Sequence, residues 1–214
     1  MYLDENLMAT SERRASYALR TLPVRDEALN AWHVRLEFPA RPGVLALETY
    51  ATDLDLAQAR FVHLRRVFFD NGQLALEHRL DLDGKRLRDG AVYYRSGQLR
   101  EKMTPAPNGH DSVTEAFHEN GQLMSRTAYH GEQPADGEYL AYDDRGNLSS
   151  RSHLKDGQLH GLWEVFHASG ALFQRVNYVH DRPVGRFEQW DQHGRLVKEE
   201  DWPASALASG GHGG

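Results

Sequence analysis

Hydrophobic and polar residues alternate with a period of two along most of the chain, and glycines interrupt the alternation at regular intervals. The segment Trp163–Phe166 alternates before one such glycine, and the segment Leu172–Tyr178 alternates after it. A period of two is typical of β-strands, because successive side chains point to opposite faces of a sheet. Two alternating segments joined by a glycine-containing turn predict a β-hairpin.

Three residue columns recur in phase across six units of 24 or 25 residues. The turn glycines are Gly72, Gly97, Gly121, Gly146, Gly170 and Gly194. An aromatic residue lies four residues before each glycine, at Phe68, Tyr93, Phe117, Tyr142, Phe166 and Trp190. A leucine lies two residues after each glycine, at Leu74, Leu99, Leu123, Leu148, Leu172 and Leu196. A period of this length indicates a stacked array in which neighbouring units complete one another's apolar surface.

The turn chemistry leaves two hairpin registers open. A two-residue Asn-Gly turn would place the recurring aromatic diagonal to the recurring leucine, whereas a three-residue loop ending in glycine would place them directly opposite. We favour the three-residue loop, because it pairs the two apolar columns. The aromatic column could form a stacking platform for bases or sugars, but its shared period with leucine favours core packing.

The predicted fold class is all-β: an elongated array of about six to seven stacked β-hairpins with a small N-terminal α+β cap. Residues 1–58 form the cap, with short helices such as Ser11–Arg20 and a degenerate first hairpin made of Trp32–Phe38 and Val44–Tyr50. Residues 59–203 form the repeat array. Residues 204–214 are predicted to be a disordered tail, because they are rich in glycine and serine.

Composition excludes several function classes. The chain has 214 residues, of which 40% are apolar, and it has no cysteine, so disulfides and thiolate metal sites are excluded. Its apolar runs are too short for a spanning helix. It has no recognisable secretory signal, and we expect a cytoplasmic location. The formal net charge of −6 argues against nucleic acid as a partner and would suit a basic protein.

The segment Gly161–Leu172 resembles the MORN repeat variant, whose pattern is a glycine, two aromatics, an Asn-Gly-like turn and a leucine. The segments Gly137–Leu148 and Gly185–Leu196 match the pattern equally well, and the resemblance covers residues 60–202. It implies a protein-binding β array, and because the chain carries no catalytic motif we expect this array to be non-enzymatic. Bacterial proteins of this kind are often antitoxins or immunity proteins, so the implied partner is a cognate toxin or effector. The alternative that the resemblance implies is a MORN-like scaffold that binds anionic membrane lipid.

Each turn glycine is followed five residues later by a charged residue, and the four central members of this column are cations. They are Lys102, Arg126, Arg151 and Arg175. This stripe could meet an acidic partner, or it could be a solvated face balanced by acids such as Glu115 and Glu164. In that structural alternative the cations could also stack on Tyr139 and Trp163. The predicted partner-binding site consists of the four cations with Tyr139 and Trp163 beside them.

No catalytic, cofactor or metal site is predicted. The chain contains no nucleophile elbow, no phosphate-binding glycine loop and no His-Glu-x-x-His motif. Among its twelve histidines, His118 and His167 share a repeat position, but they are two units apart and cannot share an ion. His153, His160 and His167 have no spacing typical of zinc.

Overall fold

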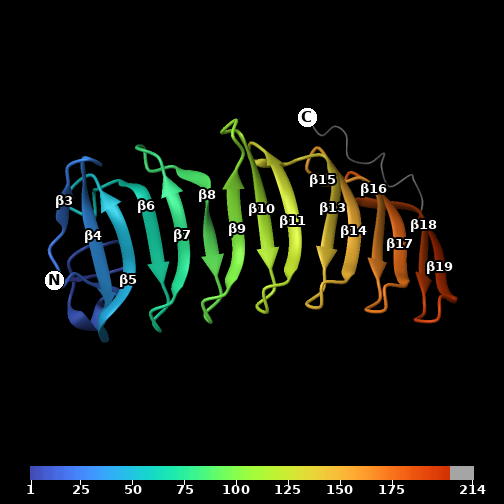
Figure 1. Cartoon of the computed structure of the whole chain (residues 1–214), viewed down its shortest axis with the longest axis horizontal. Coiled ribbons are helices and arrows are strands. Elements are labelled where there is room, and N and C mark those ends of the chain that lie inside the picture. Colours follow the sequence, from blue (N-terminus) through green and yellow to red (C-terminus); the bar gives the residue numbers. More distant parts are fainter. Residues whose placement is uncertain (203–214) are drawn as a thin grey trace, which may run out of the picture. The chain divides into compact units, whose positions relative to one another are not determined.

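The computed structural model describes residues 1–202, so the predicted tail at 204–214 lies outside the described residues. The chain divides into two compact units, residues 1–104 and the residues from 105 onward, which are described separately below. Both units consist of antiparallel strands in hairpin order (Figure 1), which confirms the all-β hairpin array.

The strands of the first unit follow the chain in sequence. They are β1 (Tyr2–Leu3), β2 (Tyr17–Ala18), β3 (Val24–Asp26), β4 (Ala31–Phe38), β5 (Arg41–Ala51), β6 (Phe61–Phe68), β7 (Leu74–Leu80), β8 (Arg86–Tyr93) and β9 (Leu99–Pro105). From β3 to β9, each strand pairs with the next. Strand β2 pairs with both β1 and β4.

The second unit repeats the hairpin with short extra strands at its connectors. Its strands are β10 (Asp111–Phe117), β11 (Leu123–His130), β12 (Gln133–Pro134), β13 (Gly137–Tyr142), β14 (Leu148–Lys155), β15 (Gln158–Leu159), β16 (Gly161–Phe166), β17 (Leu172–Val179), β18 (Arg182–Trp190) and β19 (Leu196–Trp202). Hairpins β10–β11, β13–β14, β16–β17 and β18–β19 are joined side by side through the pairs β11–β13, β14–β16 and β17–β18.

The recurring aromatic and leucine lie directly opposite one another in all six repeats, as the three-residue loop predicts. The pairs are Phe68–Leu74, Tyr93–Leu99, Phe117–Leu123, Tyr142–Leu148, Phe166–Leu172 and Trp190–Leu196. In the first loop the Phe69 amide donates to the Gln73 carbonyl at 2.8 Å, and the Gly72 amide donates back to Phe69 at 2.9 Å. Gly72 has φ +86°, a left-handed conformation that glycine adopts without a steric penalty.

The N-terminal region is less helical than the sequence pattern suggests. The predicted helix at Ser11–Arg20 is wrong: this segment contains only a 3-10 turn, η1 (Glu12–Arg14), followed by β2. Leu3, Tyr17 and Leu19 instead pack against the sheet, and these tertiary contacts outweigh local helix propensity. The degenerate first hairpin is confirmed as β4 and β5, with Phe38 opposite Arg41 at the turn.

The buried core of the first unit lies where the N-terminal segment covers strands β4 to β6. Its buried members are Leu3, Val34, Leu36, Leu47, Ala51 and Leu56. The recurring aromatics of the array are only half-buried. In the second unit this is because no helix or second sheet within its described part covers them. Their pairing with leucine therefore removes part of their apolar surface from water.

Candidate binding surfaces

A row of mostly charged side chains crosses one face of the second unit. We call this the charge row; it consists of Glu115, Arg126, Leu140, Arg151, Glu164, Arg175, Glu188 and Glu199. Each member is directly opposite the next across an antiparallel strand pair, so all the side chains point to the same face. Cations and acids alternate along most of it, which confirms that acids balance the cationic stripe.

Ion pairs fix the cations of the charge row. The Nε atom of Arg151 donates to the Oε2 atom of Glu164 at 2.9 Å, and the Nε atom of Arg175 donates to Glu188 at 2.6 Å. The carboxylates are covered, with 11% and 13% of these two glutamate side chains exposed, while the arginines stay 43% and 44% exposed. The guanidinium groups therefore form the outer surface and the carboxylates lie beneath them. The hydrogen bond to Glu164 also raises the pKa of Arg151, so its charge persists.

Arg126 is held less tightly than the other two arginines. Its Nε atom lies 3.7 Å from the Oε1 atom of Glu115, and the two side chains are 65% and 36% exposed. Exposed pairs of this kind contribute little to stability. Arg126 is thus the charge-row cation that can be removed at least cost to the fold.

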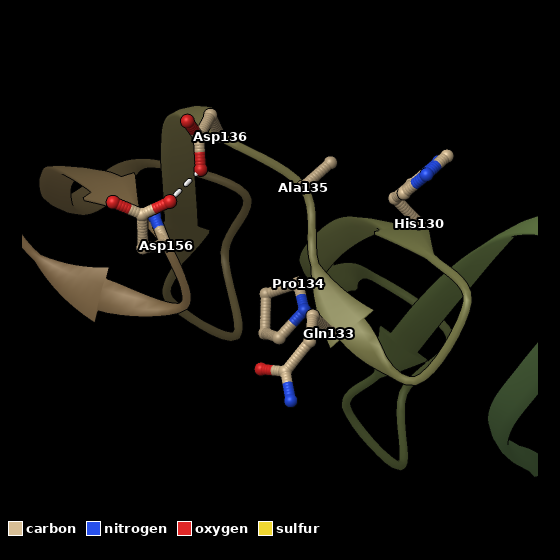
Figure 2. A pocket seen from close by; sticks show the side chains of 6 residues that line it. All are labelled: His130, Gln133, Pro134, Ala135, Asp136 and Asp156. Atoms are coloured by element: carbon tan, nitrogen blue, oxygen red, sulfur yellow. Dashed lines mark hydrogen bonds between the residues drawn. The ribbon is translucent and has the colours of Figure 1, made fainter.

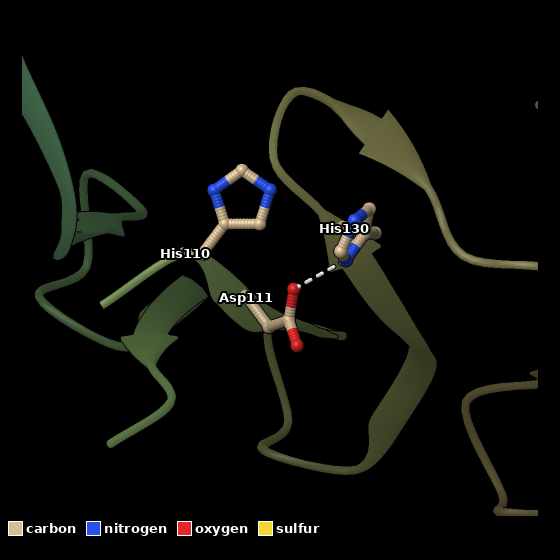
Figure 3. Close-up of side chains that lie close together, drawn as sticks. All are labelled: His110, Asp111 and His130. Atoms are coloured by element: carbon tan, nitrogen blue, oxygen red, sulfur yellow. Dashed lines mark hydrogen bonds and ion pairs between the residues drawn. The ribbon is translucent and has the colours of Figure 1, made fainter. Parts of the chain in front are cut away.

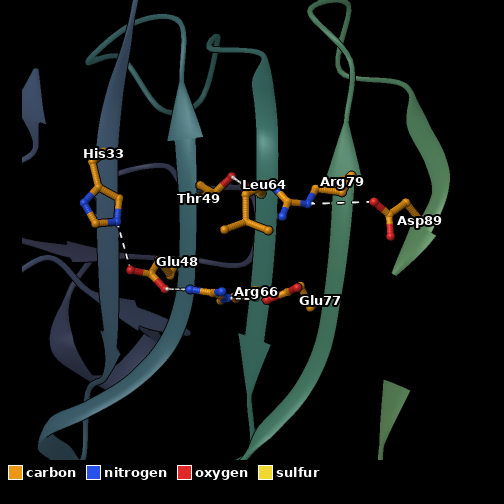
Figure 4. Close-up of polar contacts among 8 residues, drawn as sticks. All are labelled: His33, Glu48, Thr49, Leu64, Arg66, Glu77, Arg79 and Asp89. Atoms are coloured by element: carbon orange, nitrogen blue, oxygen red, sulfur yellow. Dashed lines mark hydrogen bonds and ion pairs between the residues drawn. The ribbon is translucent and has the colours of Figure 1, made fainter. Parts of the chain in front are cut away.

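The first unit contains a similar row, drawn in Figure 4. Arg66 lies between Glu48 and Glu77, with contacts of 3.2 Å and 2.6 Å, and His33 contacts Glu48 at 2.9 Å. Burial acts to raise the pKa of Glu48, but the hydrogen bonds from His33 and Arg66 outweigh it and lower that pKa. Lys102 also belongs to this unit. It is opposite Ala91, exposed, and in no ion pair with a described residue.

Tyr139 and Trp163 lie on the opposite face from the charge row, so the expectation that they stack beside the arginines is wrong. A β-bulge next to Tyr142 shifts the register by one residue, so that Arg151 is opposite Leu140 and Tyr139 is opposite Ser152. The bulge next to Phe166 has the same effect, and Trp163 is opposite the buried Val176. A one-residue shift moves a side chain to the other face of a sheet. Trp163 instead makes an edge-to-face contact with Tyr178, with ring centroids 6.1 Å apart.

Two pockets open at the connector ends of the second unit, away from the glycine turns. The first, shown in Figure 2, has a volume of about 490 Å³ and is lined by His130, Gln133, Pro134, Ala135, Asp136 and Asp156. Two of these lining residues are joined by a hydrogen bond, in which the backbone amide of Asp156 donates to the Asp136 carboxylate at 2.7 Å. The second has a volume of about 470 Å³ and shares Asp136 with the first. The sequence predicts neither pocket, because the pattern of turns does not determine how neighbouring connectors pack.

The histidines that share a repeat position connect neighbouring hairpins. The Nε2 atom of His118 lies 2.9 Å from the Tyr142 carbonyl oxygen, and that of His167 lies 3.1 Å from the Trp190 carbonyl oxygen. Each contact reaches the recurring aromatic of the next repeat.

A different group, His110, Asp111 and His130, brings three potential metal ligands together. The sequence spacing does not reveal this group, because strand pairing joins residues about 20 positions apart.

The repeat geometry agrees with the comparison to known protein families. Residues 159–180 match the MORN repeat variant family. The match spans hairpin β16–β17 and its incoming connector, which contain Gly161, the turn glycine Gly170 and the pair Phe166–Leu172. The MORN repeat variant is thus present in one hairpin repeat of the array. No curated protein matches the chain. Among residues 1–202, no helix has the length and apolar character needed to cross a membrane.

Proposed function

We propose that this chain is a non-enzymatic binding protein that uses the open face of its hairpin array to hold another protein. The observation that carries the proposal is the arrangement of the charge row, in which exposed guanidinium groups are held over covered carboxylates. In its most specific form, the proposal is that the partner is a toxin or effector, and that the chain acts in the cytoplasm as its antitoxin or immunity protein. The resemblance of the repeats to bacterial proteins of that kind supports this form.

The fixed arginines suit recognition of a protein surface. A guanidinium has five N–H donors, and the pairs at Arg151 and Arg175 leave donors free to meet carbonyl or carboxylate oxygens of a partner. Because the ion pairs already restrict these side chains, little further conformational entropy is lost on binding. Alternating acids keep the row near neutrality, which favours short-range hydrogen bonding over general attraction to phosphate-rich polymers.

The test of the site must keep the array folded. Glutamate at positions 151 or 175 would place like charges against the covered Glu164 and Glu188, so lysine is the better replacement there. We expect Arg126→Ala, Arg151→Lys and Arg175→Lys combined to weaken the complex at least about tenfold, since lysine keeps the charge but loses the planar donor fork. Lys155→Ala, at an exposed position outside the row, is the matched control. Calorimetry with the purified partner measures the affinity of each variant. Equal affinity of the wild-type chain and all variants would exclude the charge row as the binding site.

The toxin partner is tested separately. Tagged protein is recovered from the cells that encode it, and a stoichiometric partner is identified by mass spectrometry. A partner that stops growth when expressed alone, and that is neutralised by co-expression of this chain, supports the antitoxin role. Salt-sensitive binding to anionic liposomes, with no protein partner, would support the scaffold alternative.

A further inference from the structure

The side chains of His110, Asp111 and His130 converge at the connector end of hairpin β10–β11 (Figure 3). Their potential ligand atoms all lie within 4.8 Å of one another. His110 is the last residue before β10, Asp111 begins that strand, and His130 ends β11 directly opposite Asp111. The Asp111 carboxylate lies beside the His130 ring (Figure 3), and the two imidazole rings pack edge to face with centroids 4.6 Å apart.

The backbone holds these residues in place independently of any ligand. The Asn108 side-chain oxygen accepts hydrogen bonds from the amides of His110 and Asp111, at 3.1 and 3.0 Å. The Gly131 amide donates to the His110 carbonyl at 3.2 Å, which ties the two chain segments together. The His110 ring also lies against Gly131, where an added Cβ would be 3.4 Å from the ring. The backbone positions from which these side chains project are therefore set by the loops.

The carboxylate is oriented and ionised. The side-chain Nδ2 atom of Asn108 donates to the Oδ2 atom of Asp111 at 2.8 Å, and the Nδ1 atom of His130 lies 2.7 Å from the Oδ1 atom of Asp111. The hydrogen bond from Asn108, followed by that from His130, lowers the pKa of Asp111. His110 has no hydrogen bond from its ring to any residue in the described range, so its nitrogens are free to coordinate an ion.

We infer that His110, Asp111 and His130 form a binding site for a divalent transition-metal ion of the zinc class. Two imidazoles and a carboxylate are a ligand set that zinc accepts, with water completing the tetrahedron. Ligand atoms around zinc are about 3.3 Å apart when the bonds are about 2.0–2.1 Å long. Small rotations of the three side chains would bring their ligand atoms from the present positions to this spacing. His130 coordinates as the neutral ring with its proton on Nε2, and the ion takes the place of the proton between Nδ1 and Asp111.

A second histidine pair in the same unit offers a matched control. The rings of His160 and His180 have centroids 5.6 Å apart, but the Nδ1 atom of His180 faces the carboxamide oxygen of Gln158 at 2.8 Å. A carboxamide carries no charge and is a poor substitute for the carboxylate. This pair therefore tests whether two adjacent imidazoles are sufficient.

The experiment titrates the metal-free full-length chain with Zn²⁺ alone in a calorimeter. We expect one tight site per chain, at least about tenfold weaker affinity in His110→Ala, His130→Ala and Asp111→Asn, and unchanged affinity in His180→Ala. Thermal unfolding gives a second measurement: at the same Zn²⁺ concentration, the ion should raise the midpoint of the wild-type chain by more than that of Asp111→Asn. Circular dichroism without metal checks that each variant is folded. Equal Zn²⁺ affinity in the wild-type chain and the three ligand variants, or absence of a saturable site, would overturn the inference.

Discussion

The environment of His78 shows how closely two residues of this sheet depend on each other. His78 is buried, its Nε2 atom has no hydrogen-bond partner among residues 1–202, and it is directly opposite Gly90 across strands β7 and β8. A Cβ atom at position 90 would lie 2.7 Å from the Cδ2 atom of His78 and 2.4 Å from the Glu77 carbonyl oxygen. The imidazole thus occupies the space that a side chain at position 90 would need.

The burial of His78 predicts a loss of stability in mild acid. Desolvation, followed by the charges of Arg86 and Arg65, lowers its pKa from 6.5 to about 4. Between these values the unfolded chain binds a proton that the folded chain does not, so the free energy of unfolding falls as the pH falls from 6.5 to 4, by up to about 3 kcal/mol. His78→Gln should remove this contribution. Urea unfolding at several pH values measures this contribution. If the free energy of unfolding depended on pH equally in the wild-type chain and in His78→Gln, the prediction would be contradicted.

Gly90→Ala should destabilise the first unit through steric overlap. The Glu77 carbonyl belongs to the backbone of β7 and cannot move away without disturbing the strand, so we expect a cost of about 3 kcal/mol. Gly121→Ala is the comparison. Gly121 has φ +87° with no atom within 4 Å of an added Cβ, so only backbone strain of about 1 kcal/mol is expected. Chemical denaturation measures the free energy of unfolding of both variants. A larger loss of stability in Gly121→Ala than in Gly90→Ala would be inconsistent with this explanation.

Within strands, the ion pairs of the charge row predict that the same substitution, arginine to methionine, lowers the free energy of unfolding by very different amounts at different positions. Arg151→Met leaves the covered carboxylate of Glu164 without its cation and should lower the free energy of unfolding by about 2 kcal/mol. Arg126→Met removes an exposed pair with Glu115 and should cost less than about 1 kcal/mol. Thermal or urea unfolding separates the two. Similar costs would mean that burial of the carboxylate does not control the contribution of these pairs.

The glycine turns are connected to one another by side chains that reach one repeat ahead. Asn120 accepts a hydrogen bond from the Gln122 amide at 3.0 Å within its own turn, and its Nδ2 atom donates to the Asp144 carbonyl in the next turn at 2.5 Å. Asn71 makes the same pair of contacts with Gln73 and Arg95. Each asparagine therefore shapes one turn and holds the adjacent one.

Asn120→Asp separates these two roles. The aspartate keeps an acceptor for the Gln122 amide but loses the donor to Asp144, so we expect a loss of about 1 kcal/mol. Asn120→Ala loses both contacts and should cost more. Equilibrium unfolding gives the two values; equal stability of Asn120→Asp and the wild-type chain would show that the contact between turns contributes nothing.

At the scale of the whole molecule, burial is unevenly distributed between the two units. The first unit has a contiguous buried cluster under its N-terminal segment, whereas buried apolar side chains in the described part of the second unit are Val176 and Phe187. Regions with little buried apolar surface open more readily. We expect hydrogen exchange to be slowest in strands β4 to β6 and faster in β16 to β19. Mass spectrometry of exchanged peptides tests this, and greater protection in β16 to β19 would reverse the ranking.

The sequence period predicts the hairpins well because the turn glycine, the aromatic and the leucine are local features of each unit. The pairing of Phe117 with Leu123 follows directly from the loop length. The faces of Tyr139 and Trp163 could not be predicted, because a bulge of one residue after each turn reverses them. The grouping of His110 with His130 depends on strand register rather than on spacing. The sequence pattern favours a helix in the N-terminal segment because local propensity does not reflect the nonlocal packing of this segment with Val34 and Leu36.

The contacts between turns also bear on how such a chain can change over evolutionary time. In Asn71, Asn120 and His118, the side chain and the carbonyl that it meets are 24 residues apart. A duplication of one whole repeat would supply a new donor together with a new acceptor, and the copy would dock on its neighbour without further substitutions. An insertion of a few residues would separate donor from acceptor on both sides. Gain and loss of complete repeats are therefore the length changes that this architecture tolerates most readily.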